Sequence, residues 1–317
     1  MWRVVVAVAT LAALAGGAVE IEPLVHRGVT EASASAREPA AVAQNPTDPS
    51  TPDPPLPTPP PPPPPRDFAA LEALVQEDSQ ASGATVSVAL IELAGQGAAS
   101  WSYLGDVPYA AASTYKLPLL MAEAEGIANG TLAGSDQLCY QDADYEDGYY
   151  QDYVAGACYT RDELAWRAGQ KSDNTAAHIL VRYLGGGDAM NAYARAHGAT
   201  ESSYYDNNVT TANDLARLWV SEADGSAGGA AAQAWLYPLL ENTAYEAGVP
   251  AGLAGATVAH KVGMIDDVVN DAALVLSGPS VPYVLVVCTA GVGGTQAFGL
   301  IAKVSSQVGQ VEATRGA

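Results

Sequence analysis

Two regions of alternating apolar and polar positions stand near the start of the chain's main domain. The alternation has a period of two over 86–93 and again over 100–104, which predicts two β-strands. Gly95 and Gly97 lie between them, so the two strands are expected to form a hairpin. Strand composition returns in the last third of the chain, at 258–262, 269–277 and 283–290.

The middle of the chain has helical spacing instead, and an amphipathic stretch at 297–311 predicts a closing helix. Thr160-Arg161-Asp162-Glu163 is a capping box, and Thr211-Ala212-Asn213-Asp214 resembles one with Asp in the Glu position. This order predicts an α/β (α+β) fold: one antiparallel sheet built from both ends of the domain. An all-helical subdomain is expected between its second and third strands.

The first 66 residues lack the composition of a folded core. Arg3 precedes an apolar run from Val4 to Val19 that contains small residues of the cleavage type, which predicts a signal peptide over 1–19. An uncleaved anchor is the alternative, although the run is shorter than the ~20 residues that a spanning helix needs. Residues 20–66 are predicted to be a disordered, proline-rich linker, because 13 of the 21 prolines lie within 46–66.

Such a proline-rich segment stiffens into polyproline II and acts as a spacer. A ligand for a proline-recognition domain is the alternative, but a stalk through a cell wall explains the same composition in an exported chain. We therefore expect residues 67–317 to form one extracytoplasmic domain, either secreted or associated with the cell envelope.

The chain carries 35 acidic and 14 basic residues, a net charge of −21. This charge argues against nucleic acid and against anionic membrane surfaces as partners, and solubility is its simplest explanation. The histidines and cysteines show no metal-ligand spacing, so neither a metal nor another cofactor is expected.

Cys139 and Cys158 bracket a loop rich in tyrosine and acidic residues, and a disulfide between them is predicted for an exported chain. Cys288 would then be left as a small apolar residue within a buried strand. The bracketed loop could bind a glycan or an ammonium group through its rings and carboxylates. A solvated, disulfide-tethered loop is the alternative.

Three short motifs follow one another along the domain. They are Ser113-Thr114-Tyr115-Lys116, Ser172-Asp173-Asn174 and Lys261-Val262-Gly263, which read S-x-x-K, S-D-N and K-x-G. The chain has four lysines, and two of them complete these motifs, so the pattern is not a by-product of a lysine-rich surface. Serine enzymes that attack β-lactams and D-Ala-D-Ala peptides use this set.

The first motif suits nucleophilic catalysis on physical grounds. Ser113 stands where a loop is expected to enter a helix, so the helix dipole and its own N–H favour negative charge there. Lys116 lies three residues later on the same helical face, within reach of Ser113. A second cation nearby would favour the neutral form of Lys116, which can act as a base. The alternative role for Ser113 is a helix N-cap.

The order of motifs and elements resembles the class A β-lactamase fold of the penicillin-recognising serine enzymes, a β-lactamase/transpeptidase-like architecture. The resemblance covers essentially all of 67–317. Its supporting stretches are Ala111-Ala112-Ser113, Ser172-Asp173-Asn174-Thr175-Ala176 and Asn270-Asp271.

The resemblance implies a role for each remaining motif residue. Ser172 would pass a proton to the leaving nitrogen, and Asn174 would present its amide to the acyl side chain. Lys261 would attract the substrate carboxylate and polarise Ser172. Gly263 would let the substrate approach the strand edge, and the Met264 N–H would be the second oxyanion donor.

The same motif residues also have structural alternatives. Asp173 would face inward and brace its turn. Alternatively, Ser172 or Asp173 caps the helix that begins near Asn174. For Lys261 the alternative is an exposed strand terminator.

Two departures from the family pattern limit this reading. Val262 replaces the usual hydroxyl residue, which removes a hydrogen bond to the substrate carboxylate. The Glu-x-x-Leu-Asn loop, whose Glu activates the deacylating water in class A enzymes, is absent between Asn174 and Thr210. Glu201 and Asp206 are the acids of 200–208, and surface positions suit both better than catalysis.

The sequence therefore predicts an exported serine hydrolase that forms an acyl-enzyme with β-lactams or D-Ala-D-Ala-like peptides and deacylates slowly. Its expected partners are a small-molecule β-lactam or a peptidoglycan stem peptide, with association to the cell wall. One alternative is a peptidoglycan DD-peptidase or transpeptidase. Another is a non-catalytic wall-binding module of the same fold, although a pure binder has no use for a nucleophile with its base.

Overall fold

The computed structural model describes residues 66–95, 98–280 and 282–315. The predicted signal peptide (1–19), the predicted linker (20–66, apart from Arg66) and Gly97 of the hairpin turn lie outside the described residues. Within those described ranges, no helix combines the length and the apolar character needed to cross a membrane.

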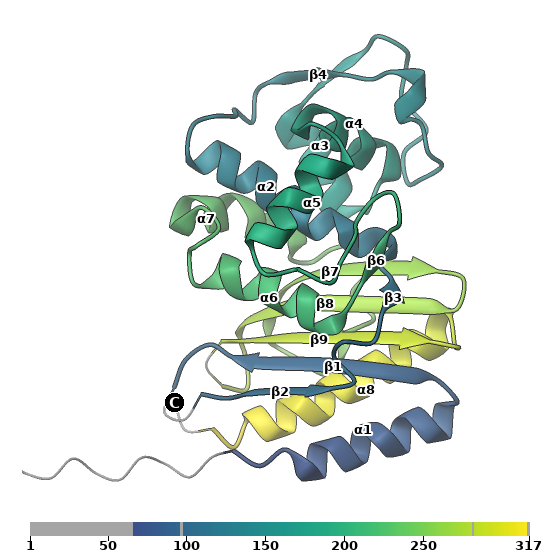
Figure 1. The fold of residues 1–317 in the computed structure, drawn as a ribbon, viewed down its shortest axis with the longest axis vertical. Helices are drawn as coiled ribbons and strands as arrows, with labels where there is room; N and C mark the ends of the chain where they lie inside the picture. Colours follow the sequence, from purple (N-terminus) through teal and green to yellow (C-terminus); the bar gives the residue numbers. More distant parts are fainter. Residues whose placement is uncertain (1–65, 96–97, 281, 316–317) are drawn as a thin grey trace, which may run out of the picture. The chain divides into compact units, whose positions relative to one another are not determined.

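The core of the domain is an antiparallel sheet of five strands in the order β2-β1-β9-β8-β7 (Figure 1). Its strands are β1 (Thr85–Glu92), β2 (Ser100–Tyr103), β7 (Thr257–Ile265), β8 (Val268–Ser277) and β9 (Tyr283–Ala290). Strands from both ends of the domain share this sheet, and the helical region is inserted between the second and third of them. The predicted fold class is thereby confirmed.

One face of the sheet is covered by α1 (Ala69–Ser82) and α8 (Gly294–Glu312), which lie side by side in Figure 1. The closing helix was predicted, but α1 was missed. The apolar pattern of α1 is short, because the apolar residues that it buries against the sheet are Leu71 and Val75, one helical turn apart.

The opposite face carries the helical region (Figure 1). At its centre lies α2, in which Leu117, Leu119, Leu120 and Met121 are all fully buried. A helix that is apolar on every side has to be enclosed by others. The helices of this region are α2 (Lys116–Ala128), α3 (Arg161–Gln170), α4 (Asn174–Leu184), α5 (Gly187–Ala196), α6 (Ala212–Ala223) and α7 (Gly229–Leu240).

Both predicted helix starts are confirmed. The Thr160 hydroxyl accepts a hydrogen bond from the Glu163 N–H at 3.1 Å, where α3 begins. In the same way, the Thr211 hydroxyl accepts from the Asp214 N–H at 3.1 Å at the start of α6. These contacts satisfy backbone donors that the first turn of a helix leaves free.

Two short strand pairs, absent from the sequence-based prediction, organise the loops. β3 (Tyr109–Ala110) pairs with β6 (Val209–Thr210), and β4 (Gln137–Cys139) pairs with β5 (Cys158–Thr160). The second pair sets Cys139 opposite Cys158, and the two form the predicted disulfide. Cys288 is unpaired and buried in β9, as expected.

Candidate active site

Ser113 lies in a short 3₁₀ turn, Ala112–Tyr115, that leads directly into α2. No side-chain bond from this turn caps α2, so the alternative role of Ser113 as an N-cap is wrong. The Ser113 hydroxyl instead accepts a hydrogen bond from Lys116 Nζ at 3.0 Å. The preceding residue, Ala112, has a φ of +47°, which is a strained value for a residue with a side chain.

Lys116 is completely buried beneath the nucleophile. Besides Ser113, its ammonium donates to the Ser172 carbonyl at 2.6 Å and to Asn174 Oδ1 at 2.7 Å. It also lies 3.4 Å from Ser172 Oγ. The first two motifs, which are more than fifty residues apart in the sequence, therefore meet at a single ammonium group.

Lys261 reaches the same serine from the sheet. Its ammonium donates to Ser172 Oγ at 2.9 Å and to the Val262 carbonyl at 2.8 Å. Lys261 is only 2% exposed, so the alternative of a solvent-exposed strand terminator is wrong. Ser172 itself has a φ of +55°, so its backbone is held in a left-handed conformation while its hydroxyl lies between two lysines.

Burial lowers the pKa of both lysines, and repulsion by Lys261 lowers that of Lys116 further. Burial, and then the neighbouring charge of Lys261, hold the pKa of Lys116 well below its usual range. Burial lowers the pKa of Lys261 to about 7, while the nearby Asp271 carboxylate opposes that shift. Two cations that share one serine favour the state in which one of them is neutral. The lowered pKa of Lys116 therefore favours a neutral amine beside the Ser113 hydroxyl.

Asp173 and Asn174 tie the S-D-N turn to the disulfide-bracketed loop. Asp173 is fully buried and caps α4 by accepting from the Ala176 N–H at 2.8 Å. Its carboxylate also accepts from the Tyr150 N–H at 2.8 Å and the Tyr153 hydroxyl at 2.6 Å. Both expected roles of Asp173, cap and brace, are present, and the loop is more than a solvated tether.

The Asn174 amide contacts two residues that the sequence did not single out. Its Nδ2 donates to the Asp147 carbonyl at 2.7 Å and to Glu146 Oε1 at 3.1 Å. Glu146 Oε2 in turn lies 2.8 Å from His178 Nε2. The Glu146 carboxylate is thus linked through one side chain to Lys116. Its position in the loop gave no signal, because its partner lies 28 residues away.

Gly263 packs closely against the nucleophile turn. A Cβ at this position would lie 2.5 Å from the Ala111 carbonyl oxygen and 3.0 Å from the Ser113 N. The close approach that requires glycine is therefore between β7 and the chain's own nucleophile turn. This contact fixes the strand edge beside Ser113.

A cleft of about 350 Å³ lies at Ser113. Ser113, Ser172, Asn174 and Met264 of the predicted set are among its lining, and Val262 borders it from β7. The cleft also takes in Gly148 and Tyr149 of the disulfide-bracketed loop, together with Lys171 and Tyr245. Tyr149 is the ring of the tyrosine-rich loop that faces the cleft, and it is 54% exposed.

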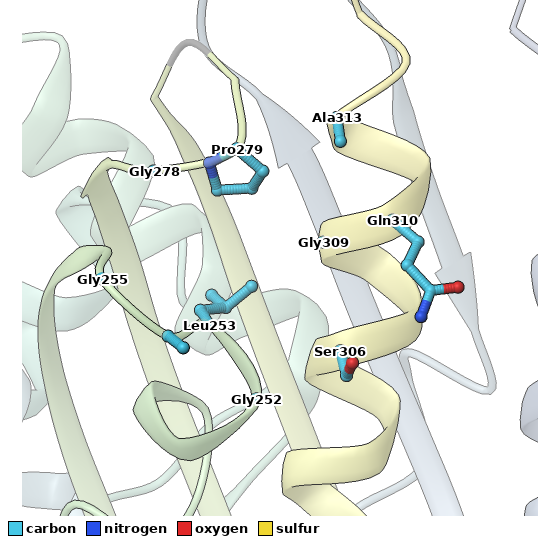
Figure 2. A pocket seen from close by; sticks show the side chains of 10 residues that line it. Gly252, Leu253, Gly255, Gly278, Pro279, Ser306, Gly309, Gln310 and Ala313 are labelled. Atoms are coloured by element: carbon cyan, nitrogen blue, oxygen red, sulfur yellow. The ribbon is translucent and has the colours of Figure 1, made fainter.

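A second hollow of about 440 Å³ lies beside α8 (Figure 2). Figure 2 shows Leu253, Pro279, Ser306, Gln310 and Ala313 around it, with glycines between them. None of its lining residues titrates near neutral pH, so it lacks the chemistry found at Ser113.

The two acids of the segment 200–208 stand apart from this cluster. Glu201 and Asp206 are both exposed, as expected for surface carboxylates. Asp206 Oδ2 lies instead beside Gly187, 3.2 Å from where a Cβ would stand. Among the described residues, neither acid is hydrogen-bonded to Ser113, Lys116 or Ser172.

Residues 69–311 match the profile of the Beta-lactamase enzyme family. A β-lactamase of Rhodobacter capsulatus is 35% identical over 130 residues, which are 41% of this chain and 44% of that protein. The matched region thus spans less than half the length of this curated relative.

Several solved structures are similar to this chain over most of its length. The structure of PBP-A is 28% identical and has a TM-score of 0.70, with 78% of this chain and 98% of that chain covered. A variant of PBP-A, an acyl-enzyme with penicillin G, has a TM-score of 0.71 over the same shares. An ancestral (GNCA) class A β-lactamase is 25% identical, with a TM-score of 0.69 over 76% of this chain and 99% of that one.

Proposed function

Because the chain belongs to the Beta-lactamase enzyme family, we propose that it is an exported serine hydrolase whose Ser113 forms an acyl-enzyme with β-lactams or D-Ala-D-Ala-like peptides. The observation that carries this proposal is the hydrogen-bonded chain from Ser113 through Lys116 and Ser172 to Lys261. A binding module would not need a buried amine against a serine hydroxyl, which supports an enzyme over a non-catalytic wall binder.

Acylation follows from these positions. The neutral Lys116 amine takes the proton of Ser113 as its oxygen attacks the carbonyl carbon of the amide. The N–H groups of Ser113 and Met264 receive the developing oxyanion. Ser172 donates its proton to the leaving nitrogen as the C–N bond breaks, and the proton that Lys116 took from Ser113 replaces it. The result is a serine ester and a released, protonated nitrogen, with Lys261 as the cation for the substrate carboxylate.

We further propose that deacylation limits turnover. A hydrolysing water needs a general base, and a positioned one typically contributes 10²- to 10⁴-fold. The Glu-x-x-Leu-Asn sequence is missing, and Glu201 and Asp206 are exposed. The Glu146 carboxylate accepts a hydrogen bond from Asn174, but its side chain is 52% exposed and also contacts His178. It is therefore not a dedicated base for a hydrolysing water.

The test is a time course with a β-lactam. Intact-protein mass spectrometry after mixing with benzylpenicillin should show one lasting adduct. Stopped-flow traces with a chromogenic cephalosporin should show a burst equal to the enzyme concentration, followed by slow release. Fast linear turnover without a burst would contradict slow deacylation. The absence of both an adduct and turnover would contradict the hydrolase and favour the wall-binding module.

A peptidoglycan DD-peptidase or transpeptidase is the second candidate. The similarity to PBP-A over 78% of the chain and the missing Glu motif favour it. The discriminating measurement is release of D-Ala from a diacylated Lys-D-Ala-D-Ala peptide, with and without an added amine acceptor. Release that the acceptor accelerates would identify a transpeptidase, whereas β-lactam turnover without D-Ala release would identify a β-lactamase.

Export is part of the same proposal, with peptidoglycan or a β-lactam as the partner outside the cytoplasm. Its support is the apolar leader, the proline-rich linker and the disulfide between Cys139 and Cys158. Fractionation of the producing cells should find the domain in the envelope or the medium. Non-reducing peptide maps of that material should contain the cross-linked peptide, and two free thiols would contradict the proposal.

A further inference from the structure

Most lysines and arginines in the described part of the chain have a carboxylate partner. Arginines and lysines on all sides of the domain lie within 4 Å of an Asp or Glu oxygen. Among the described residues, four cations have no such partner: Lys116, Lys171, Arg195 and Lys261. In a chain with 35 acidic and 14 basic residues, an unpaired cation needs an explanation.

Three of these four cations are gathered at the Ser113 cleft. Lys116 and Lys261 belong to the acylating machinery, while Arg195 stands exposed on α5. Lys171 is the third cation at the cleft, and the mechanism does not use it. It lines the cleft immediately before Ser172, at the end of α3.

Two aromatic rings hold the Lys171 ammonium in place. Its Nζ lies 5.5 Å from the ring centroid of Tyr149 and 5.8 Å from that of Trp166. Ring faces attract a cation but do not neutralise its charge. Tyr149 and Trp166 are 54% and 43% exposed, so a ligand can reach the ammonium between them. The C-terminal end of α3 also favours a cation there, but the helix dipole does not neutralise the Lys171 charge, which can still bind an anion.

We propose that Lys171 and Tyr149 form a subsite for a second carboxylate of the substrate, carried on its acyl side. The inference rests on the proposed function, in which Lys261 holds the first carboxylate. Lys171 and Asn174 flank Ser172 on the helical side of the cleft, whereas Val262 and Met264 line it from β7. A group on the acyl side that faces Asn174 therefore lies on the same wall as the Lys171 ammonium. The preferred donors are dianions, such as an acidic penicillin or a peptide with a free carboxylate before its D-Ala-D-Ala end.

Benzylpenicillin and carbenicillin are a suitable pair of probes, because carbenicillin adds one carboxylate to the same acyl side chain. Lys171→Gln should lower the second-order acylation rate constant for carbenicillin about fivefold to tenfold, the size of one charged contact at a partly exposed site. The rate constant for benzylpenicillin should change less than twofold. Lys171→Arg should restore the carbenicillin rate, since it keeps the charge.

Arg195→Gln is the matched control, because it removes an unpaired, exposed cation outside the cleft and changes the net charge equally. It should leave the ratio of the two rate constants unchanged. Equal losses for both penicillins in Lys171→Gln, or no loss for either, would overturn the subsite. An equal change of the ratio in Arg195→Gln would also overturn it, because the effect would then come from overall charge.

Equilibrium binding separates this inference from the proposed function. In Ser113→Ala no ester can form, so dissociation constants measured by calorimetry report recognition alone. Adding Lys171→Gln to that variant should weaken carbenicillin binding about fivefold to tenfold and spare benzylpenicillin. This result would hold even if the wild-type chain formed no ester, and carbenicillin binding that is independent of residue 171 would refute the subsite.

Discussion

Ser113 is bordered by two groups of residues that contact it in different ways. On one side, Lys116 and Lys261 are buried, and hydrogen bonds from their amines join them to the two motif serines. On the other side, the segment 199–210 touches the nucleophile turn through backbone and rings. There the Ala111 N–H donates to the Asn208 carbonyl at 2.7 Å.

The aromatic residues of the segment 199–210 contact the nucleophile turn through ring packing, without a charged group. The ring of Tyr205 stands edge-on to Tyr115, with centroids 6.0 Å apart, and edge-on to the ring of His178 at 5.2 Å. A desolvated, hydrogen-bonded amine can remove a proton from a serine, but an aromatic edge cannot activate water. The difference between the two regions indicates a cleft arranged for forming an ester more than for hydrolysing it.

The largest expected effect tests whether the acyl-enzyme forms beside the two buried lysines. Ser113→Ala should abolish the penicillin adduct completely, because it removes the oxygen that forms the ester and leaves Ser172, the proposed proton donor, in place. Intact-protein mass spectrometry measures the adduct. Ser135→Ala, an exposed serine outside the cleft, is the control and should acylate normally. An adduct that persists in Ser113→Ala would contradict the assignment of Ser113 as the nucleophile.

The next effect is the pH dependence of acylation, which should be bell-shaped. Lys116 has to be neutral to act as a base, so the rate falls as pH falls through its lowered pKa. Lys261 has to be cationic, and its pKa of about 7 means that this contribution is present below pH 7 and lost above it. At pH 9 the second-order acylation rate constant should be about a hundredfold below its maximum.

Lys261→Arg should remove the alkaline limb, because a guanidinium stays charged over this range. Second-order acylation rate constants between pH 5 and pH 10 provide the measurement. A wild-type rate that stays level from pH 7 to pH 9 would show that the charge of Lys261 is not used.

A smaller effect is expected where β7 departs from the family pattern. Val262 borders the cleft and is 4% exposed, so Val262→Thr places a hydroxyl at nearly the same volume. One hydrogen bond to the substrate carboxylate should raise the acylation rate constant about tenfold. Val154→Thr, at a valine that is 64% exposed and outside the cleft lining, should change nothing. An unchanged rate in Val262→Thr would mean that Lys261 alone holds the carboxylate.

The smallest effect concerns Glu146, whose carboxylate contacts both Asn174 and His178. Glu146→Gln keeps an oxygen for the Asn174 amide but removes a negative charge that raises the pKa of Lys116. The acid limb of the pH profile should therefore move to lower pH. Asp142→Asn is the control, since Asp142 is an exposed acid of the same loop. An unmoved limb, or an equal movement in the control, would reduce Glu146 to a structural contact.

Much of the architecture was determined by local patterns in the sequence. Alternation with a period of two located the first two sheet strands, and strand composition located the other three. Thr160 and Thr211 marked two helix starts, because capping depends on near neighbours. The three motifs identified Ser113, Lys116, Ser172 and Lys261 because each needs a particular residue type at a fixed spacing. Helix α1 was missed because Leu71 and Val75 form too short an apolar pattern.

Tertiary structure alone decided which distant groups meet at the cleft. The disulfide and the bonds of Asp173 hold the 139–158 loop against the S-D-N turn, which brings Glu146 to Asn174 and Tyr149 to Lys171. The reason for glycine at 263 is likewise a contact with the backbone of Ser113. Local sequence sets the conformation of each segment, but the charge and burial of a side chain depend on the segments that pack around it. The lowered pKa of Lys116 and the unpaired charge of Lys171 could therefore be seen only in the folded domain.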